Sequence, residues 1–99
     1  MKVVFTERAI AMLEQIGDYI ASDNPERALS FVRELRGKAL GLADMPRAFP
    51  LVPRHERHGI RRRVHGHYLI LYVVRQDHVV IIAFVHGARD FGRFLLSEE

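Results

Sequence analysis

The chain has 99 residues, of which 48% are hydrophobic and 27% charged, and it contains no cysteine. This length fits a single domain over residues 1–99, and the apolar content is too high for a disordered chain. Without cysteine the chain has no disulfide framework, thiolate metal site or thiol nucleophile, which fits a reducing cytoplasm. No apolar run approaches the roughly 20 residues that span a bilayer, and Lys2 and Glu7 bring charge too early for a signal peptide.

The net positive charge lies in the second half of the chain. Residues 1–49 hold 7 basic and 7 acidic side chains, whereas residues 50–99 hold 8 basic and 5 acidic ones. The excess is concentrated between residues 54 and 65, where Glu56 is the only acidic residue among Arg54, Arg57, Arg61, Arg62, Arg63, His55, His58 and His65. Such a field attracts phosphates or an acidic protein partner, although a solvated basic surface has the same composition.

Two consecutive helices are expected after a short strand at residues 3–5. Thr6 is a good N-cap, and apolar residues then recur at helical spacing from Ile10 to Ile20, so the first helix is expected to end near residues 22–23. Asn24 and Pro25 form a second start signal, since Asn caps a free backbone N–H and Pro suits the first helical position. The second helix is expected to run to about Asp44. Because few residues separate the two helices, we expect them to form an antiparallel hairpin.

After Gly59 the apolar pattern changes from helical to strand-like. Residues 46–58 contain three prolines and no period, which predicts a loop, and strands are expected at 60–64, 68–74 and 79–85. Residues 89–96 are expected to form a short helix or a pairing segment. This order predicts an α+β domain, in which the helical hairpin packs on a mostly antiparallel sheet of three to four strands. The second sheet face lacks a helix of its own except this tail, which points to a binding face.

Two histidine arrangements have residue types that could carry chemistry. His65 and His67 would share a strand face and hold one metal ion, but no acidic residue nearby in sequence supplies a third ligand. His86 and Asp90 resemble a general base and its orienter, but no serine or cysteine nucleophile is near them. We therefore expect no metal, no cofactor and no catalytic residue.

The run Arg61-Arg62-Arg63 is more informative. On a strand, Arg61 and Arg63 point one way and Arg62 the other, so one face carries two guanidinium groups that suit phosphates or carboxylates. The alternative is a solvated strand face. Three aromatic residues of the expected strands have the types that stack on bases but also build cores: Tyr68, Tyr72 and Phe84. The chain has no Gly-rich phosphate loop of the Walker or GxGxxG kind.

Several segments together carry a family resemblance over nearly the whole chain. They are the opening strand, Thr6-Glu7-Arg8-Ala9 through Ile16-Gly17-Asp18-Tyr19-Ile20, Asn24-Pro25-Glu26-Arg27-Ala28, Gly59-Ile60-Arg61-Arg62, His67-Tyr68-Leu69-Ile70-Leu71-Tyr72-Val73-Val74 and Val85-His86-Gly87-Ala88-Arg89-Asp90. The Gly-x-Tyr-Leu-Ile-like strand, followed about fifteen residues later by His-Gly-Ala-Arg-Asp, is the most specific combination. In this order the segments resemble the ParE branch of the RelE/ParE toxin superfamily of bacterial toxin–antitoxin modules.

The resemblance implies the toxin of a type II module, of the kind associated with plasmid stabilization. ParE-type toxins are small basic proteins that bind DNA gyrase, trap it on cleaved DNA and block replication, without catalysis of their own. Their antitoxins, ParD-like or related, have a DNA-binding part and a flexible part that wraps the toxin. The resemblance therefore implies a hetero-oligomer with the antitoxin, which alone contacts operator DNA.

Two alternatives remain open at the level of sequence. RelE-type members cut mRNA on the ribosome, and Arg61, Arg63 and Arg89 could supply charge there while His86 transfers a proton. Against this, the tail has no tyrosine, and Lys2 and Lys38 are the only lysines. The second alternative is a basic nucleic-acid-binding module, for which the chain has no base-reading motif.

These considerations select two sets of candidate binding residues. For the target we expect Arg61, Arg63, Arg89 and Phe94, of which Arg89 rests on the His-Gly-Ala-Arg-Asp match and the first two on charge alone. For the antitoxin we expect residues around the helical hairpin, namely Tyr19, Phe31 and Leu35. Burial in the chain's own core is the equal alternative for Phe31 and Leu35.

Overall fold

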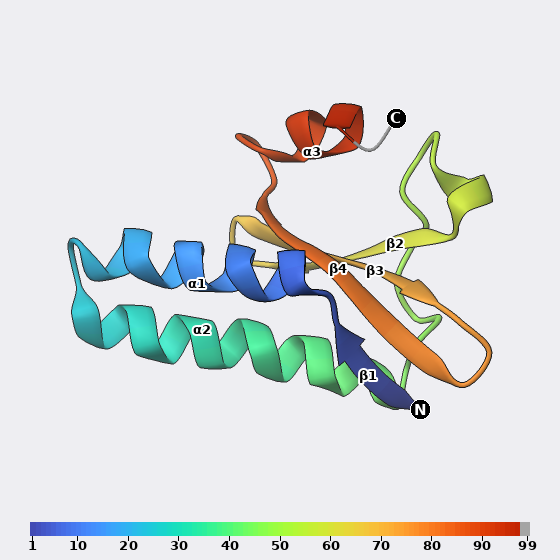
Figure 1. The fold of residues 1–99 in the computed structure, drawn as a ribbon, viewed down its shortest axis with the longest axis horizontal. Helices are drawn as coiled ribbons and strands as arrows, with labels where there is room; N and C mark the ends of the chain where they lie inside the picture. The colour runs from blue at the N-terminus through green and yellow to red at the C-terminus, as the bar shows by residue number, and fades with distance from the viewer. Residues whose placement is uncertain (98–99) are drawn as a thin grey trace.

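The computed structural model describes residues 1–97 and contains four strands and three α-helices (Figure 1). In chain order they are β1 (Lys2–Phe5), α1 (Glu7–Ala21), α2 (Pro25–Leu40), β2 (Ile60–His65), β3 (Tyr68–Val74), β4 (His78–His86) and α3 (Phe91–Ser97). Short 3-10 turns lie at Gly41–Ala43 (η1) and Glu56–His58 (η2). In the described part of the chain, no helix is both long and apolar enough to cross a membrane.

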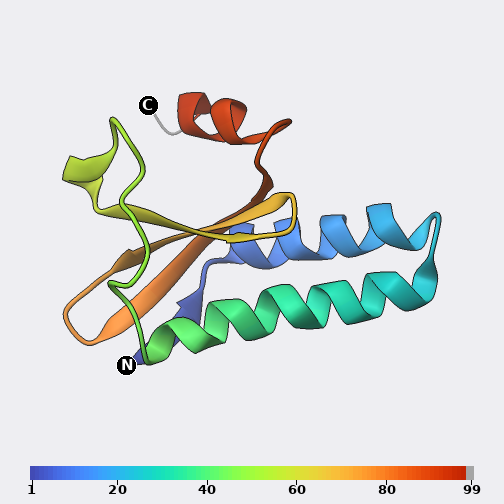
Figure 2. The same cartoon turned by 180° about the vertical axis from the view of Figure 1, so that it is seen from behind.

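The four strands form one sheet in the order β1-β4-β3-β2. The pairs β2–β3 and β3–β4 are antiparallel, whereas β1 pairs in parallel with β4, from Lys2 opposite His78 to Phe5 opposite Ile81. The predicted α+β class and the mostly antiparallel sheet are therefore confirmed. Helices α1 and α2 lie together against one side of the sheet, and α3 lies on the far side of β4 from them (Figures 1 and 2).

Both helices of the hairpin begin directly after the N-cap residues that the sequence predicts. The Thr6 hydroxyl accepts a hydrogen bond from the Ala9 N–H at 3.0 Å, and the Asn24 side chain accepts one from the Arg27 N–H at 3.1 Å. Helix α2 ends at Leu40, earlier than the expected end at Asp44, because the chain tightens into η1 before the proline-rich loop. The hairpin therefore has the predicted form with a shorter second helix.

The sheet is buried on both faces at its centre, which explains the apolar runs without polar alternation. Side chains of β3 alternate between two clusters: Tyr68, Ile70 and Tyr72 pack against the helices, and Leu69, Leu71 and Val73 pack on the opposite face. On that second face, Val52 from the loop and Phe94 from α3 complete the cluster. The proline-rich loop before β2 and helix α3 thus cover much of the sheet face that faces away from the helical hairpin.

Candidate protein-interaction groove

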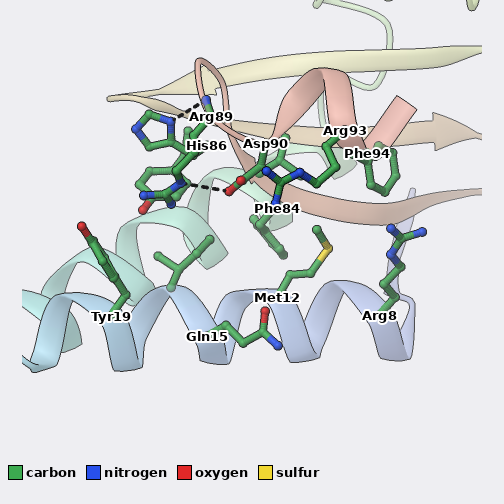
Figure 3. Close-up of a pocket in the computed structure, with 13 residues that line it drawn as sticks. Arg8, Met12, Gln15, Tyr19, Phe84, His86, Arg89, Asp90, Arg93 and Phe94 are labelled. Carbon is green, nitrogen blue, oxygen red and sulfur yellow. Dashed lines mark hydrogen bonds and ion pairs between the residues drawn. The ribbon is translucent and has the colours of Figure 1, made fainter. Parts of the chain in front are cut away.

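A hollow of about 560 Å³ lies between α1 and the segment that follows β4 (Figure 3). Helix α1 contributes Arg8, Met12 and Tyr19, and the segment after β4 contributes Arg89 and Arg93 among its lining residues. We call this hollow the interaction groove. It brings together residues that are about 70 or more positions apart in the chain, so helical packing alone does not create it.

Backbone hydrogen bonds fold the segment after β4 back toward α1. The Gly87 N–H donates to the His67 carbonyl and the Asp90 N–H to the His86 carbonyl, both at 2.8 Å. The Arg89 N–H also donates to Nδ1 of His86 at 3.1 Å. The His86 side chain therefore caps the turn from which the Arg89 side chain projects into the groove (Figure 3).

The groove combines positive charge with an apolar floor. Arg8, Arg89 and Arg93 line it, whereas Asp90 is its one carboxylate among the residues described, and Asp90 pairs with Arg89 at 3.4 Å. The Arg8 guanidinium carbon lies 4.5 Å from the centroid of the Phe94 ring. A partially exposed apolar floor with excess cationic charge suits an amphipathic, acidic protein segment.

Three of the predicted binding residues meet in this groove. Tyr19, expected to bind the antitoxin, is 64% exposed, and Arg89, expected to bind the target, lies above its ring. Phe94 also lines the groove but is only 4% exposed, because it packs into the second core cluster beneath Arg8. The sequence analysis did not select Arg8, although it lies in the segment Thr6-Glu7-Arg8-Ala9, or Arg93, since only the fold brings them to Arg89.

Phe31 and Leu35 lie in the core between α2 and the sheet. Phe31 is 8% exposed and packs on the rings of His65 and Tyr68, both at 5.4 Å between centroids. Leu35 has no exposed surface. The geometry thus favours the core alternative over direct contact with an antitoxin, because a docking partner cannot reach a fully buried side chain.

Comparison with known proteins agrees with this architecture. A family model described as the ParE toxin of the type II toxin-antitoxin system parDE matches residues 3–91. The chain belongs to this ParE toxin family. The matched residues run from β1 to the first residue of α3, and they include both Tyr19 and Arg89 of the interaction groove.

A solved structure also shares the fold of this ParE family member. It is described as the chromosomal ParDE TA system from P. aeruginosa, and it matches with a TM-score of 0.74 at 21% sequence identity. The match covers 87% of this chain and 95% of the other chain. No curated protein sequence matches the chain.

Arg61 and Arg63 lie away from the groove and bind backbone carbonyls. An Nη1 of Arg61 donates to the Phe49 carbonyl at 2.7 Å, and Nη1 of Arg63 donates to the Lys38 carbonyl, near the end of α2, at 3.0 Å. The Arg63 guanidinium also stacks over the Phe49 ring at 4.6 Å. In this ParE family member the geometry therefore favours a structural role for both arginines over the predicted contact with a target.

Tyr72 belongs to the same structural arrangement. It lies opposite Arg61 on the helix-facing side of the sheet, and its hydroxyl donates to the Pro46 carbonyl at 2.9 Å. Burial raises the pKa of the Tyr72 phenol, an effect that the nearby charges of Arg61 and Arg63 partly oppose. Tyr72 is thus a core residue that holds the proline-rich loop. Phe84 is also a core residue, since it is 1% exposed.

The histidines considered for chemistry have other partners. Nε2 of His65 bonds to a Glu34 carboxylate oxygen at 2.9 Å, whereas the His67 ring stacks on His86 with centroids 6.0 Å apart. Within residues 1–97, no group of three or more His, Cys, Asp or Glu side chains is arranged to hold a metal ion. Asp90 pairs with Arg89 instead of orienting His86, so the two do not form a base–orienter pair in this structure.

Proposed function

We propose that this ParE family member inhibits DNA gyrase in the cytoplasm by protein–protein binding, and that a cognate ParD-like antitoxin neutralises it. The observation that carries the proposal is the position of Arg89. This residue of the His-Gly-Ala-Arg-Asp segment projects into a groove with an exposed aromatic ring and two further arginines. Arginine and tyrosine are the residue types that dominate binding energy at protein interfaces.

A non-catalytic mechanism fits the contacts made by His86 and Asp90. Nδ1 of His86 accepts the Arg89 backbone N–H, and the Asp90 carboxylate pairs with the Arg89 side chain. Acid–base catalysis of RNA cleavage needs two groups free to exchange protons with the substrate. Nδ1 of His86 and the carboxylate of Asp90 both contact Arg89, which supports a role of these two groups in positioning a binding residue.

The same groove offers a mechanism of neutralisation. The Arg89 guanidinium lies over the Tyr19 ring. An antitoxin segment that binds Tyr19 therefore covers Arg89 as well. A flexible acidic segment that folds on binding suits a cationic groove with an apolar floor. Antitoxin and gyrase then compete for one surface, and the toxin reaches operator sequences only as part of the antitoxin complex.

The test is a supercoiling assay with purified gyrase and the purified chain, read out both as supercoiled product and as trapped cleaved DNA. Inhibition with trapped cleavage, reversed by the product of the neighbouring gene, is the expected result. No effect on either readout, together with new cut sites in translated mRNA, would contradict the proposal in favour of ribosome-dependent cleavage.

A further inference from the structure

A second hollow, of about 710 Å³, lies beside η2 and shares no lining residue with the interaction groove. Five basic side chains line it: Arg54, His55, Arg57 and His58 from the loop before β2, and Arg75 from the turn after β3. We call it the basic hollow. It contains four basic residues of the segment 54–65 to which neither the fold nor the proposed function assigns a role.

The charge of the basic hollow is not paired with carboxylates among the residues that the structure describes. None of its lining residues is acidic, and no carboxylate among residues 1–97 pairs with Arg54, Arg57 or Arg75. By contrast, Arg27 pairs with Glu34 at 2.6 Å and Arg89 pairs with Asp90. Because like charges repel, a site that gathers three guanidinium groups without a counterion attracts an anion.

The backbone at this site forms a tight turn. Arg54 has φ 71°, and it is the one non-glycine residue at positive φ in the described chain. Arg54 is the third residue of a turn that the His55 N–H closes on the Val52 carbonyl at 3.0 Å, and with Pro53 before it such a turn requires a positive φ. The turn directly precedes η2, so Arg54 and His55 line the hollow together with Arg57 and His58 of η2.

The composition of the hollow selects among anionic ligands. Of its three apolar lining residues, Ile60 is 8% and Val73 5% exposed and Ile82 is half-buried, so no large exposed apolar side chain is present to anchor a peptide. It is lined by no Phe, Tyr or Trp on which unpaired bases would stack, as single-stranded nucleic acids require. Cations without an aromatic platform match the phosphates of a duplex, whose binding depends on charge and not on base contacts.

We propose that the basic hollow binds the phosphodiester backbone of duplex DNA without sequence preference. The planar guanidinium forks of Arg54, Arg57 and Arg75 pair with phosphate oxygens, and the imidazoles of His55 and His58 add N–H donors. This contact is separate from operator reading by an antitoxin and does not depend on gyrase inhibition. Because the two sites have no residue in common, the chain can hold DNA and a protein partner together.

The experiment measures fluorescence anisotropy of a labelled 20-base-pair duplex, titrated with the full chain at several salt concentrations. The variant carries Arg54→Ala, Arg57→Ala and Arg75→Ala. We expect at least a tenfold loss of affinity at about 50 mM salt, and a slope of log K against log salt that is shallower by about 2.7, since each phosphate contact contributes about 0.9. Thermal melting of both proteins by circular dichroism establishes that the variant is folded.

A charge-matched control carries Arg33→Ala, Arg36→Ala and Arg47→Ala, three exposed arginines outside the hollow. It is expected to retain most of the affinity and the slope. An equal loss in the control would overturn the proposal, because net charge alone would then explain binding. Tighter binding of a single strand of the same length would overturn the duplex assignment. Binding of a polyglutamate peptide without binding of DNA would place an acidic protein segment in the hollow instead.

Discussion

The guanidinium carbon of Arg89 lies 5.3 Å from the centroid of the Tyr19 ring. This contact joins the segment after β4 to α1 and brings a residue expected to bind gyrase against one expected to bind the antitoxin. Exposed cation–π contacts contribute about 0.5–1 kcal/mol, too little to hold the two segments together against a tightly bound partner. Both groups are therefore available to exchange their mutual contact for contacts with another protein.

Replacing Arg89 tests the proposed contact with the target. Arg89→Ala is expected to reduce gyrase inhibition at least about tenfold, corresponding to about 1.4 kcal/mol of binding energy. The measurement is the half-inhibitory concentration in the supercoiling assay, together with the growth of cells that express the chain without antitoxin. Arg33→Ala removes the same charge from the exposed surface of α2 and should leave inhibition unchanged. Unimpaired toxicity of Arg89→Ala would exclude Arg89 from the binding surface.

Replacing Tyr19 tests the antitoxin contact separately. Tyr19→Ala is expected to weaken antitoxin binding about tenfold in calorimetry, because exposed aromatic side chains are frequent energetic anchors. Tyr19→Phe keeps the ring and should retain most of the affinity. Leu29→Ala is the control, since Leu29 is 56% exposed on α2 and does not line the groove. Equal affinities for Tyr19→Ala and the unsubstituted chain would place the antitoxin elsewhere.

The structural role of Arg61 predicts an effect on stability. Arg61→Met removes a charged hydrogen bond to the partly buried Phe49 carbonyl, and it should lower the free energy of unfolding by about 1–2 kcal/mol. Arg62 is the natural control, because it points to the other face of β2 and its side chain donates no hydrogen bond within residues 1–97. Arg62→Met should change the free energy by less than about 0.5 kcal/mol in urea denaturation. Similar losses for the two variants would remove the structural role assigned to Arg61.

The contacts of the arginines show where sequence reasoning ends. The alternation of a strand correctly placed Arg61 and Arg63 on one face, since that depends only on local backbone geometry. Their partners are the carbonyls of Phe49 and Lys38, and a backbone carbonyl has no residue-specific signal in the sequence. Charge density therefore predicted a binding site where the fold uses the charge to hold a loop.

The helices, the strand pairing and the interaction groove also differ in whether they depend on local signals or on contacts between distant segments. Thr6 and Asn24 marked the helix starts because a cap acts within three residues of itself. The parallel pairing of β1 with β4 and the meeting of Tyr19 with Arg89 depend on contacts between distant segments, which periodicity does not encode. The family resemblance singled out Arg89, but only the structure placed Arg8 and Arg93 beside it.

The ion pairs of Glu34 predict a dependence of stability on pH. Hydrogen bonds from Arg27 and His65 lower the pKa of the Glu34 carboxyl below its usual value of 4.5. A lowered pKa stabilises the folded state above the unfolded-state value, and this contribution is lost as the pH falls through the folded-state pKa. Glu34→Gln should therefore flatten the fall in melting temperature below about pH 4.5. Glu14→Gln, at a residue that pairs with no cation among those described, should leave the acid limb of the profile unchanged.

Substitution by alanine is expected to have opposite effects on the free energy of unfolding at two glycines, Gly37 and Gly59. Gly37 is an exposed residue in the interior of α2, and a Cβ added there meets nothing within 4 Å. Gly37→Ala should raise the free energy of unfolding by about 0.5–1 kcal/mol, because alanine restricts the unfolded chain and favours the helix.

Gly59 also has open space around it, but its φ of 72° lies in the left-handed region before β2. Gly59→Ala should lower the free energy of unfolding by about 1 kcal/mol, since a Cβ is disfavoured in that conformation. Urea denaturation of the two variants at neutral pH separates backbone conformation from packing, because neither new methyl group touches a neighbour. If both variants were stabilised, the left-handed turn at Gly59 would not be the conformation of the folded chain.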